Sequence, residues 1–423
     1  MATFPKIPEW VQLEHHVARI LTDQELHGWY FNEQAAWELE SALRRELEDV
    51  TQLLRNRFPF TPGTVFTPKR SNRTRGYVEG APFTKLKDTN PASRDHIAWI
   101  LQTFDNWSPS VYTATGKPVV DEVELAAHGT DIAMSFLKIL DTTKKLGMLS
   151  EGNNAWNKLV TKNRIHHHCS VATNTHRCAH RSPNLSQVPS DSRFRELFTA
   201  TPGLAMVGAD LAGIELRMLG HYLARYDGGR YVDILLNGDI HQENADKIGI
   251  SRKLVKNVTY AFLYGAGDIK IGHTYDKQLS EDKARKKGKE IRAAYIEAVD
   301  GLDRLLSAIK EKAASGKIRS IDGRNILLDS QHKALNYCLQ SGAGTIAKRW
   351  MVMANDYIKE HPYYEARQLG FIHDELQFEA PLKYTNDVQF ILELNAARAG
   401  EFYELRCPVA AESKVGRTWA DVH

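Results

Sequence analysis

Apolar residues recur at intervals of three and four along the first part of the chain, a spacing that predicts packed helices. Two long series of this kind occupy residues 10–21 and 36–54. The same spacing returns at 94–104 and 130–146 and predicts helices there. Residues 58–93 are instead broken by repeated Pro and Gly, so we expect a loop-rich insertion at this point rather than core.

The second part of the chain alternates between strand and helix patterns. The pattern of residues 163–210 predicts short strands and turns, and Asp210 lies at the end of their last apolar run. Beyond it, the pattern predicts helices at 213–226, 251–315 (about three) and 333–360, a small hairpin bracketed by 315–323, and two strands joined by an acidic turn at 369–378. The expected fold class is α+β, with helices around a small antiparallel sheet.

The length of 423 residues is several times that of one compact domain, so the chain is expected to divide into subdomains. Its content of 42% hydrophobic and 25% charged residues is typical of a folded protein rather than a disordered one. Four scattered Cys make no disulfide framework, and no leader or long apolar run is apparent. These features favour a reducing, cytoplasmic location.

The net charge of +3 is too small to indicate a nucleic-acid partner by itself. Local basic clusters are more informative. One lies in the insertion at 58–76 and the other in a helical stretch; their members are Lys69, Arg70, Arg73 and Arg75, and Lys283, Arg285, Lys286, Lys287, Lys289 and Arg292. Each is equally consistent with a solvated loop or helix face.

Two aspartates follow apolar strands, and they carry the strongest chemical signal. Asp210 ends one strand and Asp374 follows another. Carboxylates that meet at one sheet edge can hold two magnesium ions about 4 Å apart. Either residue alone would more often be a turn former or a helix cap.

The text around these aspartates resembles the motifs of family A DNA polymerases. Residues 210–217 (DLAGIELR) resemble motif A, and 372–375 (IHDE) resemble motif C. Motif B, Arg-x3-Lys-x3-(Phe/Tyr)-x3-Tyr-Gly, is matched by Arg252, Lys256, Tyr260, Tyr264 and Gly265. Other segments are similar to replicative polymerases of T-odd podophages: YVEGAPF (77–83), NPASRDHI (90–97), NGDIH (237–241), FLYGAGDIKIG (262–272) and LQSGAG (339–344).

This resemblance covers nearly the whole chain and implies the right-hand polymerase fold of thumb, palm and fingers. The implied subdomains are N-terminal helices and thumb at 1–160, a first palm segment at 161–235, fingers at 236–330 with the motif B helix at 251–264, and a second palm segment at 331–423. The implied activity is template-directed DNA synthesis on a primer, with primer-template DNA and deoxynucleotides as partners.

The implied metal site holds two Mg²⁺ ions, for which Mn²⁺ can substitute. Asp210 and Asp374 would hold them with the backbone carbonyl of Leu211, while Glu375 would support the site. Phosphoryl transfer depends on positioning and charge neutralisation, so these carboxylates and Lys256 are the predicted catalytic residues.

The motif B residues are four apart and therefore share one helix face. By resemblance, Arg252 and Lys256 grip the triphosphate, Tyr260 flanks the sugar and base, and Tyr264 lies by the templating position. His241 would assist at the phosphates. The plainer alternative is a helix with ordinary aromatic packing, which the aligned Arg and Lys make less favoured.

Glu215 matches the carboxylate that crowds a ribose 2′-hydroxyl in DNA-making relatives. Single-subunit phage RNA polymerases lack it and are the alternative enzyme; an inactive primer-template binding protein is the non-enzyme alternative. Residues implied at the minor groove of the primer end are Arg177, Asn336, Gln340 and His373. His176 precedes Arg177 where the family usually has Gly, which weakens that alignment.

A His/Cys cluster at 166–180 has ligand types for zinc. Its members are His166, His167, His168, Cys169, His176, Cys178 and His180. Structural zinc sites usually pair ligands two to four residues apart in separate knuckles, a spacing absent here. The sequence therefore favours a polar hairpin near the primer and leaves metal binding open.

Full-length phage relatives begin with a proofreading exonuclease built on Asp-x-Glu. The only such text, at 23–25, lies in a helical pattern, so we expect no exonuclease in this chain. The insertion at 58–76 is short where T-odd enzymes bind thioredoxin, so a thioredoxin-type partner is not expected. Separate exonuclease or replisome proteins, the source and the fidelity are not specified by the sequence.

Overall fold

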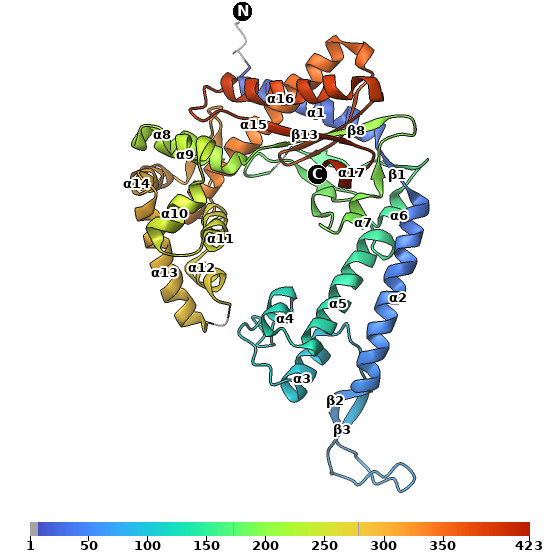
Figure 1. The fold of residues 1–423 in the computed structure, drawn as a ribbon. Coiled ribbons are helices and arrows are strands. Elements are labelled where there is room, and N and C mark those ends of the chain that lie inside the picture. Colours follow the sequence, from blue (N-terminus) through green and yellow to red (C-terminus); the bar gives the residue numbers. More distant parts are fainter. Residues whose placement is uncertain (1–6, 172, 278) are drawn as a thin grey trace, which may run out of the picture. The chain divides into compact units, whose positions relative to one another are not determined.

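The computed structural model describes residues 7–171, 173–277 and 279–423 (Figure 1). The chain divides into two compact units. Unit 1 combines Met1–Ala35 with Trp156–His423, and unit 2 is Ala36–Ala155. Helix α2 (Glu33–Arg57) starts at the end of the first segment of unit 1 and continues into unit 2.

A four-stranded antiparallel sheet lies at the centre of unit 1, in the order β11-β12-β8-β13. Its strands are β8 (Ala205–Leu211), β11 (Arg367–Ile372), β12 (Glu375–Ala380) and β13 (Ala411–Gly416). All of β8 except Asp210 is buried. A strand covered on both faces needs apolar or small residues at successive positions, which explains why its sequence runs apolar without alternation.

Helices cover this sheet. Helix α16 (Thr385–Phe402) packs along β8 and β13, and Figure 1 shows α16 beside β13. The short helix α17 (Trp419–Val422) packs on the same two strands. Gly208 permits this approach, because a Cβ there would lie 2.7 Å from the Val422 side chain.

Two long helices join the N-terminal segment to the sheet. Helix α1 (Glu9–His27) packs against α15 (Ala334–Glu360) and β11. The Lys348 side chain of α15 is fully buried, and its Nζ lies 2.8 Å from both carboxylate oxygens of Glu14. A buried ammonium group is tolerated only when it is paired in this way, so this contact fixes α1 against α15.

In the described part of the chain, seven helices lie between β8 and the β9–β10 hairpin. They are α8 (Ile214–Asp227), α9 (Arg230–Asn237), α10 (Ile240–Ile248), α11 (Arg252–Leu263), α12 (Asp268–Tyr275), α13 (Glu281–Ala298) and α14 (Leu302–Ala313). Helices α12 and α13 pack antiparallel with their backbones in contact. A Cβ on Gly272 would lie 1.9 Å from the Ala284 carbonyl oxygen, and one on Gly288 would lie 1.8 Å from that of Asp268.

Smaller elements complete unit 1. Its three-stranded sheet has the order β4-β1-β7, and two hairpins pair β5 with β6 and β9 with β10. The bounds are β1 (Trp29–Phe31), β4 (Arg164–Ile165), β5 (His168–Ser170), β6 (Ala179–Arg181), β7 (Phe198–Thr199), β9 (Lys317–Arg319) and β10 (Asn325–Leu327). Short helices and turns are α6 (Trp156–Leu159), α7 (Ser192–Arg195), η2 (Leu185–Gln187), η3 (Gln331–Lys333), η4 (Pro362–Tyr364) and η5 (Leu382–Tyr384).

Unit 2 is helical with one hairpin. Besides most of α2 it contains α3 (Arg94–Phe104), α4 (Glu122–His128), α5 (Asp131–Leu146), the π-helical turn η1 (Gly147–Glu151), β2 (Phe60–Phe66) and β3 (Phe83–Asp88). Its core is built from Leu54, Phe58, Ile97, Leu101, Trp107 and Phe136, among others.

Most of the predicted elements are confirmed, including the two N-terminal helices and the strands around the acidic turn. The 58–93 segment is loop-rich and mostly exposed as expected, although β2 and β3 pair within it. Pro62 and Gly63 are accommodated at a register shift between Pro62 and Val65. The 251–315 segment holds four helices rather than about three, and the boundaries proposed at 235 and 330 stay predictions.

No helix in the described ranges combines the length and the apolar character that crossing a bilayer requires.

Candidate active site at the edge of the central sheet

Strand pairing brings the two predicted aspartates together. In the β8–β12 ladder, Asp210 lies opposite Glu375, the residue after Asp374. The Leu211 backbone N–H donates to the Asp374 carbonyl oxygen at 3.0 Å, which locks the end of β8 to the β11–β12 turn. The turn itself is tight, and His373 takes a φ of 58° within it.

The two carboxyl groups lie in an environment that disfavours their negative charge. Partial burial, followed by the charge of Asp374, raises the pKa of Asp210 to about 7. Burial, followed by the charge of Glu215, raises the pKa of Asp374 to about 6. The Asp210 residue is nevertheless exposed at its strand end, so its carboxylate is open to a ligand. Such a pair favours a bound cation, and carboxylate oxygens are the ligands that Mg²⁺ prefers.

Glu375 is held differently from the two aspartates. It is buried, and one carboxylate oxygen accepts hydrogen bonds from Gln377 Nε2 and from Trp419 Nε1, the latter at 2.6 Å. Its other oxygen lies 3.1 Å from Nδ1 of His423. Three partners therefore fix this carboxylate behind the aspartates, and none of the three was identified as a site residue from the sequence.

Glu215 links three parts of the site. It lies at the start of α8, after Gly213, whose φ of 56° turns the chain out of β8. Arg177 Nη2 donates to Glu215 Oε1 at 2.9 Å, and the Tyr264 hydroxyl donates to the same oxygen at 3.1 Å. The predicted motif A, the end of the motif B helix and Arg177 therefore converge on one carboxylate.

Helix α11 presents the predicted nucleotide-binding residues along one face. Ser251 caps its N-terminus by accepting from the Leu254 N–H, and Tyr264 follows its last residue. Lys256 is exposed and forms no ion pair with any residue that the structure describes. Burial, with the charge of Glu215 next, raises the pKa of Tyr260.

Two residues that precede α11 in sequence pack against this face. The Arg252 guanidinium donates to Asp239 Oδ2 at 2.6 Å, and it lowers the pKa of that carboxyl group. The ring of His241 lies 6.2 Å from that of Tyr260, and its Nδ1 is buried without a hydrogen-bond partner. Asp239 was missed at the sequence level, although an Asp before a helix is a typical N-cap and it does cap α10.

The four predicted DNA-contacting residues do not share one environment. Arg177 bonds Glu215, whereas Asn336 is buried and donates from Nδ2 to the Leu263 carbonyl oxygen at 2.7 Å. Gln340 lies one turn further along α15 and is half-buried. The ring of His373 packs edge-on against His180, 5.6 Å between centroids. Their roles in DNA binding stay predictions.

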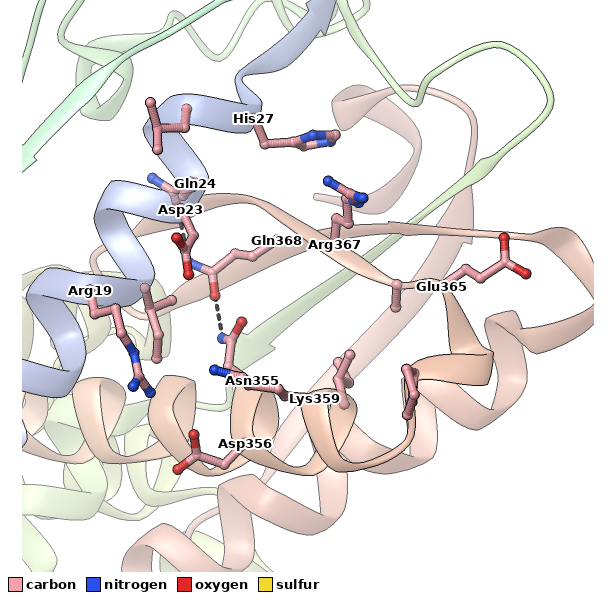
Figure 2. Close-up of a pocket in the computed structure, with 15 residues that line it drawn as sticks. Arg19, Asp23, Gln24, His27, Asn355, Asp356, Lys359, Glu365, Arg367 and Gln368 are labelled. Carbon is pink, nitrogen blue, oxygen red and sulfur yellow. Dashed lines mark hydrogen bonds between the residues drawn. The ribbon is translucent and has the colours of Figure 1, made fainter.

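A cavity of 690 Å³ lies away from these carboxylates, between α1, the end of α15 and β11. Figure 2 shows its polar lining, including the hydrogen bond between Asn355 and Gln368. Neither aspartate lines it, and it holds charges of both signs. We therefore assign the chemistry to the sheet edge, where the perturbed carboxylates lie, rather than to this larger hollow.

Comparisons with known proteins show the family and the fold of the chain. Residues 77–421 match the model of DNA polymerase family A. The DNA-directed DNA polymerases of Escherichia phage T7 and Enterobacteria phage T3 are each 30% identical, over 98% of this chain and 70% of their own length. The structure of the POL domain of Pol1 from M. smegmatis, in complex with DNA primer-template and dNTP, superposes with a TM-score of 0.78. It is 21% identical, and the match covers 96% of this chain and 70% of that one.

The fold and the site define a template-directed polymerase of the right-hand class. The chain belongs to the family A DNA polymerases, and it is an enzyme of DNA synthesis.

The raised pKa values of Asp210 and Asp374 predict how Mg²⁺ affects stability. The folded state holds protons at these carboxyl groups to higher pH than the unfolded state, so the metal-free protein loses stability as pH rises from about 4 to about 7. Mg²⁺, as the predicted ligand of the ionised groups, should raise the melting temperature more at about pH 8 than at about pH 5.5, where protons compete.

Thermal unfolding with and without Mg²⁺ at both pH values measures this effect. The Asp210→Asn variant should lose most of the Mg²⁺-dependent rise at the higher pH. An equal rise at both pH values, or a full rise in the variant, would contradict the proposed cation site.

Proposed function

We propose that this chain extends a primer 3′-hydroxyl with deoxynucleotides by phosphoryl transfer assisted by two magnesium ions. The observation that carries the proposal is the pair Asp210 and Asp374, held at one sheet edge with raised pKa values. We also propose that the chain does not proofread, because its only Asp-x-Glu text, Asp23–Glu25, is part of α1.

Asp210, Asp374 and the Leu211 carbonyl would hold the metal ions. When bound, such ions lower the pKa of the primer hydroxyl and neutralise charge on the triphosphate and the leaving pyrophosphate. Mn²⁺, which also accepts oxygen ligands, would substitute for Mg²⁺. Glu375, fixed by Trp419 and other partners, would keep the edge of β12 in place rather than bind a metal itself.

The α11 face would bind the incoming nucleotide. Lys256 is free to meet the triphosphate, and Arg252 would exchange its exposed bond to Asp239 for a phosphate oxygen. His241 would assist at the phosphates, Tyr260 would lie against the sugar and base, and Tyr264 would lie beside the templating position.

Primer-template DNA would approach along Arg177, Asn336, Gln340 and His373. Donors directed at the minor groove meet acceptors that are nearly independent of sequence, as a copying enzyme requires. The structural relative was solved with DNA primer-template and dNTP, which supports primer-template DNA as the partner of this fold.

Replacing Asp374 tests the metal assignment. Asp374→Asn keeps the size of the side chain but removes its charge, so it should reduce primer extension to below about a hundredth of wild type, since metal ligation supplies several kcal/mol of transition-state stabilisation. Primer-template binding, measured by fluorescence anisotropy, should stay nearly unchanged. Extension by the variant above that level would remove Asp374 from the metal site.

Glu215 is proposed to exclude ribonucleotides by its bulk. Glu215→Ala should increase ribonucleotide insertion relative to deoxynucleotide insertion, whereas Glu215→Gln, of the same size, should keep most of the discrimination. Single-nucleotide insertion kinetics with both substrates measure the ratio. If Glu215→Ala leaves it unchanged, the sugar pocket lies elsewhere and the RNA-polymerase alternative is reopened.

Tyr260 is proposed to supply a hydrogen bond where a dideoxynucleotide lacks its 3′-hydroxyl. One hydrogen bond beside a charged triphosphate contributes about 1.5–3 kcal/mol, or roughly ten- to a hundredfold in selectivity. Wild type should therefore accept dideoxynucleotides almost as well as deoxynucleotides, and Tyr260→Phe should discriminate against them while ordinary extension stays close to normal. Equal ratios in both proteins would show that Tyr260 only packs within the helix.

A further inference from the structure

The β5–β6 hairpin gathers three metal-ligand side chains on one face. Cys169 lies directly opposite His180 in the ladder, and His167 precedes Cys169 by two residues, so strand alternation places it on the same side. One possible ligand atom from each lies within 4.8 Å of the other two. All three residues are buried, His167 completely.

Hydrogen bonding leaves this cluster incompletely satisfied. Cys169 Sγ lies 3.2 Å from His180 Nδ1, yet Nε2 of His180 and Nδ1 of His167 are buried without a partner. Buried polar atoms of this kind are uncommon in folded proteins. The two adjacent histidines each have a hydrogen-bond partner. His166 contacts the Glu25 carbonyl oxygen at 2.7 Å, and His168 contacts the Glu25 carboxylate at 2.8 Å.

A chain of amides fixes what faces the cluster. Asn355 donates to Gln368, and Gln368 Nε2 donates to Gln24 Oε1 at 2.7 Å. All three residues line the cavity in Figure 2. Gln24 must therefore present its NH₂ group, which donates to His167 Nε2 at 3.0 Å and lies 3.7 Å from Cys169 Sγ. A cation that takes the lone pair of His167 Nε2 displaces the first of these bonds and leaves the amide to the sulfur. N–H donors of this type stabilise metal-bound thiolates.

The protonation states suit a soft divalent cation. Burial lowers the pKa of His167 to about 3 and that of His180 to about 4, so both imidazoles are neutral at physiological pH. Burial raises the pKa of the Cys169 thiol, which therefore keeps its proton until a cation displaces it. Binding releases that proton as the sulfur–metal bond forms.

We propose that His167, Cys169 and His180 form a structural site for one zinc-class divalent cation, with water as the fourth ligand. Two nitrogens and a sulfur, with no carboxylate, select Zn²⁺ over Mg²⁺. Tetrahedral bond lengths require ligand atoms about 3.4–3.6 Å apart, which small side-chain rotations can supply. Since His180 packs against His373, the ion would brace the turn before Asp374 without joining the chemistry.

Cobalt absorption tests this site, because only a thiolate ligand gives a near-ultraviolet sulfur-to-cobalt band. The protein is first stripped with a chelator and then titrated with Co²⁺ in excess Mg²⁺, which competes at the carboxylates. We expect that band together with the visible bands of tetrahedral cobalt, saturating at about one ion per chain, and their loss when Zn²⁺ is added.

The variants assign the band to named residues. Cys169→Ser should abolish it, whereas Cys178→Ser, a buried cysteine in the same hairpin, should keep it. His180→Gln should keep a thiolate band but weaken Co²⁺ binding at least about tenfold, which serves as the test if Cys169→Ser does not fold. Zn²⁺ should raise the melting temperature of wild type and of Cys178→Ser alone.

No thiolate band in wild type, or a band that survives in Cys169→Ser, would overturn the proposal. So would unchanged Co²⁺ affinity in His180→Gln. None of these readouts depends on polymerase activity, so failure of the metal site and failure of the proposed function are distinguishable.

Discussion

The antiparallel pairing of β8 with β12 is the constraint on which the active site depends. It forces the carboxyl groups of Asp210 and Asp374 to share one partly buried sheet edge, although burial, followed by repulsion from Asp374 at Asp210 and from Glu215 at Asp374, raises both pKa values. The ladder, together with the Leu211 N–H bond to the Asp374 carbonyl, outweighs that repulsion. The fold thus maintains an unfavourable charge arrangement that a cation relieves, which is how an electrostatically preorganised site is built.

Glu215 has a comparable organising role on the other side of the site. One of its carboxylate oxygens, Oε1, accepts hydrogen bonds from both Arg177 and Tyr264. One side chain therefore joins the β5–β6 region, α8 and the end of α11. Asn336 adds a second connection, from α15 to the Leu263 carbonyl at the end of α11. The face proposed to bind the nucleotide is therefore positioned by side-chain bonds at its C-terminal end, while Lys256 in its middle forms no ion pair with a residue that the structure describes.

The sequence predicted those features that local pattern determines. The apolar runs before Asp210 and Asp374, the four-residue spacing of motif B and the long periodic helices were all visible without coordinates. Features that depend on distant partners were not. The Asn336 side chain bonds a carbonyl 73 residues away, and Trp419 reaches Glu375 from 44 residues away. The β2–β3 pairing was missed for a different reason, because Pro and Gly inside a strand conceal it from pattern analysis.

The close packing of α12 against α13 makes this a rigid pair of helices. Their backbones touch at Gly272 and Gly288, so no layer of side chains lies between them that could rearrange and let one helix slide over the other. Arg292 of α13 extends the stiffness, since it bonds both Asp268 and the Ala266 carbonyl just beyond α11. Arg292 thus ties the paired helices α12 and α13 to the segment that immediately follows α11, so the three helices are held together as one rigid group.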